Sequence, residues 1–397
     1  MVEQHEKALV PEIRFAGFTD PWEQRKLGEL FEESDERASD REILSVSVAN
    51  GIYPASESDR ETNPGASLAN YKIVHSGDVV YNSMRMWQGA VDASRYDGIV
   101  SPAYVVARPN SEVYARFFAR LLRQPMLLKQ YQQVSQGNSK DTQVLKFDDF
   151  ASIGISMPVS ENEQRRIGGF FDRLDSLITL HQRKYDKLCV LKKSMLDKMF
   201  PKGGSLYPEI RFAGFTDPWE QRKVRDFLSE SRVKGNTGLN SRKLTVKLWG
   251  KGVIEKNDFG GSEHTQYFIR HKGQFIYSKL DFLNSAFGVI PEKLDGYEST
   301  ADLPAFDLVE MNPHFMFFTA VQEGFYLKHG SAADGSRKAK RIHVNTFLEM
   351  PIMVPTVAEQ DLIVEYLQSL DCLITLHQRK LELLRNIKKS MLDKMFV

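Results

Sequence analysis

The sequence predicts an α+β fold in which two mixed α/β domains alternate with two long helices. Two repeated blocks carry this prediction. The stretch PEIRFAGFTDPWEQRK occurs at residues 11–26 and returns without a difference at 208–223; we call each copy a PEIRF segment. A second block, DSLITLHQRKYDKLCVLKKSMLDKMF at 175–200, returns at 371–396 with most positions identical. Chance does not produce two such repeats, so the chain is an internal duplication.

The second block and the residues before it carry a helical pattern. Apolar residues recur at steps of three and four through residues 163–200 and 359–396, and no proline interrupts either range. A helix of that length spans roughly 55–60 Å. Gly168 and Gly169 weaken the beginning of the first helix, by about 1 kcal/mol each relative to alanine. Matched helices from matched halves favour an antiparallel coiled coil with a pseudo-two-fold repeat; the alternative is two helices that each cover their own domain.

Two histidines lie in the middle of the predicted helices. His181 and His377 both belong to the repeated LITLHQRK, in a stripe that Leu, Ile and Met otherwise fill. If the helices run antiparallel, their midpoints meet, and the two imidazoles form a polar pair that fixes the register. The alternative is that each histidine faces outward beside the apolar stripe.

The segments between the repeats predict one common fold with two different surfaces. Residues 31–157 and 228–354 share little, but short landmarks survive. The aligned landmarks are GDVVYN (77–82) with GQFIYS (273–278), and VLKFDDF (144–150) with RIHVNTF (341–347). Such alternating or apolar runs predict strands, and VYARFFARLLRQ (113–124) predicts an amphipathic helix that Pro125 ends. The expected division is 1–160 for the first domain, 161–201 for the first helix, 202–357 for the second domain and 358–397 for the second helix.

Composition limits the class of protein. With 397 residues, 42% hydrophobic and 26% charged, the chain suits a soluble protein of two or three domains. We expect a cytoplasmic location, because the sequence has neither a signal-peptide pattern nor an apolar run near the ~20 residues of a membrane helix. Cys189 and Cys372 are too few for a disulfide framework or a zinc site, and we interpret both as buried small hydrophobic residues. The net charge of +1 means that any nucleic-acid contact must be local or assisted by partner subunits.

Catalytic motifs are absent from the sequence. It contains no G-x-x-x-x-G-K-[ST] loop, no His-Glu-x-x-His or Cys-x-x-Cys pair, and no Asn-Pro-Pro-aromatic motif. The 52 acidic residues leave open a carboxylate cluster of the nuclease kind. We therefore expect a chain that is not an enzyme, with no cofactor and no metal of its own.

This organisation resembles the specificity (S) subunit of type I restriction-modification enzymes. The resemblance covers the whole chain, because each half has a PEIRF segment, a variable domain, a proline followed by Glu-Gln, and a helix that ends in KKSMLDKMF. The helix starts are Pro158 with Glu163-Gln164 and Pro355 with Glu359-Gln360. MRMWQGAV with GIVSPAYVVARP, within residues 84–109, is typical of one type of recognition domain in this family.

The resemblance implies a non-catalytic DNA-recognition subunit that serves phage defence in a bacterial or archaeal cytoplasm. Each target-recognition domain would read one half of a split, asymmetric site on double-stranded DNA, and the helices would hold the two readers apart. Two modification subunits, which bind S-adenosylmethionine and methylate adenine, would clasp the helices. Restriction subunits, which translocate and cut DNA, would complete the complex. S-adenosylmethionine, ATP and Mg²⁺ would belong to these partners only.

Two segments of each domain carry candidate DNA contacts. The first follows the shared strand, and the second is a loop that is basic in the second domain, where arginine suits phosphates and guanine. The alternative interpretation of the basic loop is a solvated charged loop without a specific partner. For Trp87, a place in the domain core and a place in the DNA interface are equally compatible with the sequence. The first-domain candidates are Asn82, Arg85, Trp87, Gln136, Asn138 and Lys140; the second-domain candidates are Ser278, Lys279, Arg337, Lys338, Lys340 and Arg341.

Two other functions remain open on the sequence alone. One is a duplicated coiled-coil adaptor that binds proteins and has no DNA specificity, which the near-neutral charge favours. The other is a methyltransferase or nuclease relative without recognisable motifs. Steep salt dependence of DNA binding separates a DNA reader from the adaptor.

Overall fold

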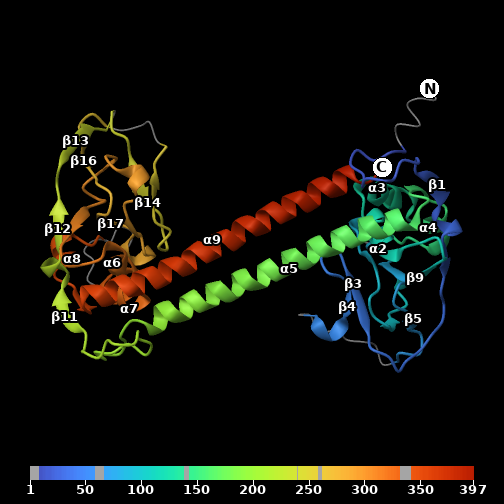
Figure 1. Ribbon diagram of the computed structural model, residues 1–397, viewed down its shortest axis with the longest axis horizontal. Coiled ribbons are helices and arrows are strands. Elements are labelled where there is room, and N and C mark those ends of the chain that lie inside the picture. Colours follow the sequence, from blue (N-terminus) through green and yellow to red (C-terminus); the bar gives the residue numbers. More distant parts are fainter. Residues whose placement is uncertain (1–8, 59–66, 138–142, 239, 258–261, 331–340) are drawn as a thin grey trace. The chain divides into compact units, whose positions relative to one another are not determined.

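A computed structural model describes residues 9–58, 67–137, 143–238, 240–257, 262–330 and 341–397. The chain divides into two compact units (Figure 1). The first comprises residues 1–182 and 378–397, and the second comprises residues 183–377. Asn138, Lys140, Arg337, Lys338 and Lys340 lie outside the described residues.

The first unit is built on a four-stranded antiparallel sheet in the order β2-β9-β6-β7. Three two-stranded antiparallel ladders surround it: β1 with β10, β3 with β4, and β5 with β8. The strands are β1 (Glu23–Lys26), β2 (Phe31–Glu33), β3 (Leu44–Ser47), β4 (Gly51–Pro54), β5 (Lys72–Val74), β6 (Val79–Asn82), β7 (Val91–Ala93), β8 (Gly98–Val100), β9 (Tyr104–Pro109) and β10 (Gly154–Met157). The helices are η1 (Leu27–Glu29), η2 (Ala55–Glu57), η3 (Met86–Gln88), α2 (Ala115–Leu121), α3 (Pro125–Val134) and α4 (Phe147–Ala151).

The second unit repeats this arrangement of sheets with one difference. Its main sheet has the order β12-β20-β17-β18, and β11 pairs with β21 as β1 pairs with β10. A three-stranded sheet, β13-β16-β19, replaces one of the two-stranded ladders. The strands are β11 (Glu220–Lys223), β12 (Leu228–Ser231), β13 (Lys234–Thr237), β14 (Leu244–Val246), β15 (Val253–Glu255), β16 (Gln266–Ile269), β17 (Phe275–Tyr277), β18 (Phe287–Val289), β19 (Glu298–Ser299), β20 (Ala305–Leu308) and β21 (Pro351–Val354). The helices are η4 (Val224–Asp226), η5 (Phe282–Asn284), η6 (Glu292–Leu294), α6 (Pro313–Ala320), α7 (Glu323–Gly330) and α8 (Val344–Leu348).

The two long helices are α5 (Glu161–Lys198) and α9 (Val357–Lys394), each of 38 residues. Both begin and end two residues before the ranges 163–200 and 359–396 over which the helical pattern was found. Inside the first unit the segments of α5 and α9 run antiparallel. Asp175 of α5 forms an ion pair with Lys388 of α9, and Gln182, further along α5, accepts a hydrogen bond at 3.0 Å from Arg385, which lies earlier in α9. Inside the second unit, Lys192 donates to Asp371 at 2.6 and 2.8 Å.

A buried glutamine anchors the beginning of each long helix. Gln164 accepts a hydrogen bond from the Tyr114 backbone N–H at 2.8 Å and donates to the carbonyls of Glu112 and Pro158. Gln360 does the same with the Asn312 N–H at 2.9 Å and with the carbonyls of Glu310 and Pro355. These contacts give a physical reason for the Pro-then-Glu-Gln pattern, because each glutamine satisfies buried backbone groups at the helix start.

Each PEIRF segment also closes the end of a long helix. The Ile13 N–H donates to the Lys394 carbonyl at 2.9 Å, and the Ile210 N–H donates to the Lys198 carbonyl at 3.0 Å. The first PEIRF segment therefore lies against the end of the last helix, as the duplication predicted.

Aromatic side chains fill the same positions in both cores. Phe117 contacts Trp22 with ring centroids 5.7 Å apart and stacks on Phe396 at 5.4 Å. In the second unit, Phe315 contacts Trp219 at 5.7 Å and stacks on Phe200 at 5.5 Å. The phenylalanine that ends each repeated block thus packs into a domain core.

The structure corrects one detail of the sequence-based expectations and adds to another. Cys372 is exposed and Cys189 is half-buried, so neither is a buried core residue. Gly168 has a packing role besides its cost to helix stability, because a Cβ there would lie 2.9 Å from the Tyr114 ring. No helix in the described ranges is long and apolar enough to cross a membrane.

Candidate nucleic-acid interface

The first candidate segment is a tight turn at the end of β6. The Asn82 side chain accepts the Met84 N–H at 3.0 Å, and the Arg85 N–H donates to the Asn82 carbonyl at 3.0 Å. These bonds fix the turn and leave the Arg85 side chain exposed. Trp87 is half-buried: its ring packs against the core and its Nε1 donates to the Met84 carbonyl at 3.2 Å.

The second candidate segment lies directly beside this turn. The Leu145 N–H donates to the Ser83 carbonyl at 2.8 Å, and Gln136 and Val144 exchange two backbone hydrogen bonds. Gln136 is exposed and its amide donates to Asp149 at 3.0 Å. The two segments were predicted separately from the sequence, but the fold brings them together at one edge of the domain.

The second domain repeats this junction with different side chains. The Ile342 N–H donates to the Lys279 carbonyl at 3.0 Å, which matches the bond between Leu145 and Ser83. The Tyr277 hydroxyl also donates to the Ile342 carbonyl at 3.0 Å, and burial raises the pKa of Tyr277 so that this hydroxyl keeps its proton. The described end of the basic loop, Arg341, is therefore anchored next to Lys279.

The predicted residues of the second domain differ in their exposure. Arg341 is exposed and lies 3.7 Å from a carboxylate oxygen of Asp302, while Lys279 is half-buried. Ser278 is buried, and its hydroxyl donates to Asp281 at 3.0 Å. The same hydroxyl accepts the Asp281 N–H at 3.1 Å, so Ser278 supports its turn from the position that Asn82 occupies in the first domain.

Sequence reasoning missed one apolar residue in each turn. Met84 is 45% exposed and Leu280 is 44% exposed, and both follow the shared strand at the same position. An apolar side chain that both turns leave exposed suits contact with sugars or a thymine methyl group. Alignment of GDVVYNSM with GQFIYSKL contains the signal, but only polar and aromatic residues were considered as candidates.

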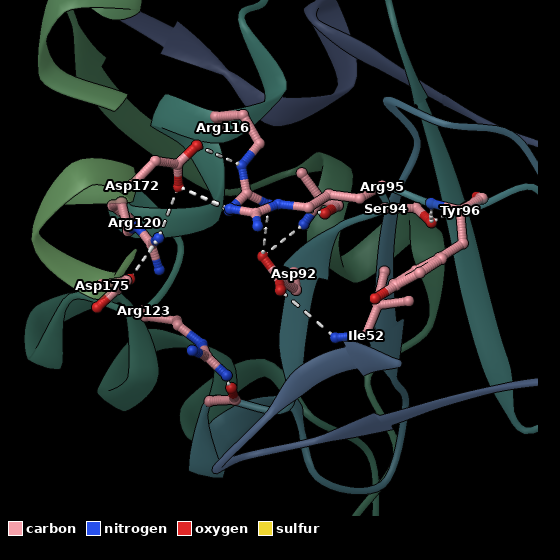
Figure 2. A network of polar contacts seen from close by, with 12 residues as sticks. Ile52, Asp92, Ser94, Arg95, Tyr96, Arg116, Arg120, Arg123, Asp172 and Asp175 are labelled. Atoms are coloured by element: carbon pink, nitrogen blue, oxygen red, sulfur yellow. Dashed lines mark hydrogen bonds and ion pairs between the residues drawn. The ribbon is translucent and has the colours of Figure 1, made fainter. Parts of the chain in front are cut away.

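A network of arginines and aspartates attaches the domain of the first unit to α5 (Figure 2). Arg116 donates to both oxygens of Asp172 at 2.7 and 3.0 Å, and Arg120 donates to Asp172 at 3.0 Å and to Asp175 at 2.7 Å. Although burial opposes ionisation, the hydrogen bond and charge of Arg116, with the charges of Arg120 and Arg95, hold the pKa of Asp172 below its ordinary value. Burial lowers the pKa of Arg123, which donates to the carbonyls of Gly89 and Val48. The network fixes the orientation of α2 on α5.

One family model matches part of the chain. Residues 19–189 match the family model for the type I restriction modification DNA specificity domain. The resemblance is confirmed. The fold agrees over the length of the chain with the S subunit of a type I restriction-modification system from M. genitalium. That structure has 13% sequence identity and a TM-score of 0.58, over 98% of this chain and 99% of that one. The HsdS subunit from Thermoanaerobacter tengcongensis matches with 17% identity and a TM-score of 0.45, over 96% of this chain and 98% of that one. No curated protein matches the sequence.

The mixed α/β fold, which matches that of the S subunit from M. genitalium, is therefore established. Among the residues that the structure describes, no three His, Cys, Asp or Glu side chains are grouped so that they could hold a metal ion. His181 is buried in the first unit and His377 is half-buried in the second. Their role in fixing the helix register remains a prediction.

Proposed function

We propose that this chain is the DNA sequence-recognition subunit of a type I restriction-modification complex. It reads a bipartite, asymmetric site with one domain for each half. It carries no catalytic group of its own. The modification and restriction subunits bind S-adenosylmethionine, ATP and Mg²⁺ and carry out the reactions that need them.

One observation carries the proposal. In both domains the same backbone hydrogen bond, Leu145 to Ser83 and Ile342 to Lys279, joins the turn after the central strand to the second segment. The backbone is common, but the side chains that it presents differ: Asn82, Arg85 and Gln136 in one domain, Lys279 and Arg341 in the other. A common frame with different polar side chains suits two readers of different base sequences.

We propose that α5 and α9 form an antiparallel coiled coil that spaces the readers, with His181 and His377 near its middle. The ion pairs support one repeated register, because Asp371 and Lys388 stand at the positions in the second block that Asp175 and Lys192 occupy in the first. Two modification subunits would bind this pair of helices.

The decisive experiment is methylome sequencing of cells that express the chain with its modification subunit. We expect adenine methylation at one two-part site, and none when either protein is expressed alone. Methylation by the purified chain without a partner would refute the non-catalytic role.

The near-neutral net charge favours one competing function, that of a protein-binding adaptor without DNA specificity. Filter binding at low and high salt separates the two. A DNA reader loses affinity steeply with salt, with a slope of about −0.9 for each phosphate contact. An adaptor shows no specific DNA binding at either salt concentration.

A further inference from the structure

The second unit contains a cavity of about 670 Å³ where its recognition domain meets the long helices. It lies between α6, the β14–β15 hairpin and segments of α5 and α9. Its lining combines aromatic, charged and amide side chains, including Lys192, Trp249, His314, Phe318, Gln368 and Asp371. None of the sequence-predicted DNA contacts that the structure describes lines this cavity.

The first unit places arginines at the positions that border this cavity. The Tyr114 and Asn312 N–H groups donate to Gln164 and Gln360 respectively, and this pair of bonds aligns α2 with α6. Phe117 and Phe315 then coincide, each 5.7 Å from its tryptophan. The alignment matches Arg116 with His314, Arg120 with Phe318, and Arg123 with Val321.

The carboxylates that accept hydrogen bonds from those arginines are only partly retained in the second unit. Asp175 corresponds to Asp371, and Asp172 corresponds to Gln368. In the first unit Asp175 accepts Arg120 and Lys388 together, as Figure 2 shows for the arginine. In the second unit Asp371 accepts Lys192, the counterpart of Lys388, and its side chain remains 46% exposed. A carboxylate that binds two cations in one repeat thus lines an open space in the other.

A tryptophan in a strained backbone stands at this cavity. Trp249 has φ +61° and is 59% exposed, and its backbone N–H donates to the Asn284 carbonyl at 2.8 Å. The left-handed region is unfavourable for a bulky residue, so holding the indole there costs free energy. The corresponding tip of the first unit, Val48-Ala49-Asn50, has no aromatic residue. An exposed indole face is the best aromatic partner for a guanidinium group.

We propose that this cavity binds an arginine side chain of a protein that assembles with this chain. Asp371 and the Gln368 amide oxygen accept hydrogen bonds from the guanidinium group, and Trp249 stacks on its plane. Burial lowers the pKa of His314, so the imidazole is neutral at pH 7 and does not repel the cation. The carboxylates of Asp371 and Glu323 balance the ammonium groups of Lys192 and Lys251 in the lining, so the cavity has no excess positive charge that would favour a nucleic-acid phosphate. The identity of the partner as a modification subunit rests on the proposed function.

The binding chemistry is tested with the isolated chain. Trp22 and Trp219 are buried, so a Trp87→Phe background leaves Trp249 as the exposed tryptophan. Titration with N-acetylarginine amide should change its fluorescence saturably at millimolar concentration. The citrulline analogue has the same shape without the charge, and we expect it to bind at least about ten-fold more weakly. An equal response to both compounds, or no response to either, overturns the proposal.

Two kinds of variant locate the site. Phe318→Arg places an arginine where the first unit has Arg120, and it should abolish binding of the arginine analogue by filling the cavity. Because that variant risks misfolding, Trp249→Ala and Asp371→Asn provide independent tests, and each should weaken binding about ten-fold. Leu248→Ala, which removes the neighbouring exposed side chain, is the matched control and should leave the analogue's affinity unchanged.

The source of the arginine is tested in the complex. Trp249→Ala should weaken assembly with the modification subunit about ten-fold, while DNA binding by the isolated chain and the Leu248→Ala control remain unchanged. Protection of Trp249 from oxidation by DNA instead of by the protein partner would overturn the proposal. If the wild-type chain binds the arginine analogue but assembles with no modification subunit, the proposed function is refuted, whereas the inference that the cavity binds an arginine side chain is supported.

Discussion

The guanidinium group of Arg14 donates two hydrogen bonds, at 2.6 and 2.7 Å, to the carboxylate of Glu163, whose side chain is 1% exposed. Arg211 binds Glu359 in the same way at 2.7 and 2.8 Å. Each arginine belongs to a PEIRF segment and each glutamate lies in the first turn of a long helix. The PEIRF segment is repeated because both helices need the same clamp.

Removal of the clamp should destabilise the unit that contains it. Arg14→Ala leaves a buried carboxylate without its cation, which costs about 3–5 kcal/mol. Arg211→Ala should cost the same in the second unit. Urea unfolding measures both, and Arg165→Ala is the control, since it breaks an exposed pair with Glu161 worth less than about 1 kcal/mol. A loss as small as the control's in both clamp variants would contradict this role.

The sequence predicted the two long helices because these depend on local signals. Periodicity and the absence of proline placed α5 and α9 within two residues of their bounds. The role of Arg14 could not be read in this way, because its partner Glu163 lies 149 positions away. Long-range pairs of this kind follow from the tertiary fold, not from a motif.

The candidate site was predictable only in part, for the same reason. The two segments of each domain were identified separately, but the bond from Leu145 to Ser83 depends on how the chain returns to the sheet. Ser278 was selected for its polarity, although its hydroxyl supports the turn. The cavity near Trp249 was missed, because a void that replaces three arginines is visible only when the two repeats are compared as structures.

Single arginine substitutions should affect one half of the DNA site each. Arg85→Ala should relax specificity at the first half-site and Arg341→Ala at the second, because the two residues lie in different domains. If Arg341 also contacts a phosphate, its loss reduces the log–log salt slope by about 0.9. Fluorescence anisotropy across a salt series, with a library of sites, measures both effects.

The matched control for these substitutions is Lys272→Ala. Lys272 is exposed, pairs with Glu292 at 2.8 Å, and precedes β17, whereas the candidate turn follows that strand. Its removal should leave affinity and specificity unchanged. Relaxation of both half-sites by either arginine variant would contradict the assignment of one domain to each half.

Acid should weaken the attachment of the first recognition domain to α5. The folded-state pKa of Asp172 is depressed, so its stabilising contribution is complete above the ordinary value of 3.8 and is lost as pH falls through the folded value. Asp172→Asn should lower the free energy of unfolding by about 2 kcal/mol at pH 7. The difference from wild type should shrink as pH falls below 3.8. Chemical unfolding at several pH values measures this, with exposed Asp40→Asn as the control; a difference that stays constant with pH would rule out the ionic role.

The last prediction concerns the spacing of the half-sites. If α5 and α9 pair along their length, seven residues inserted after Lys184 and seven after Lys380 preserve the heptad pattern of both helices. The insertion lengthens the pair by roughly 10 Å, at 1.5 Å per residue. DNA rises about 3.4 Å per base pair along a strand, so the methylome should contain a gap about three base pairs longer, with both half-site sequences unchanged. Insertion in α5 alone shifts Lys192 away from Asp371 and should destabilise the chain without producing a new gap. An unchanged gap in the double insertion would mean that the helices do not measure the distance between readers.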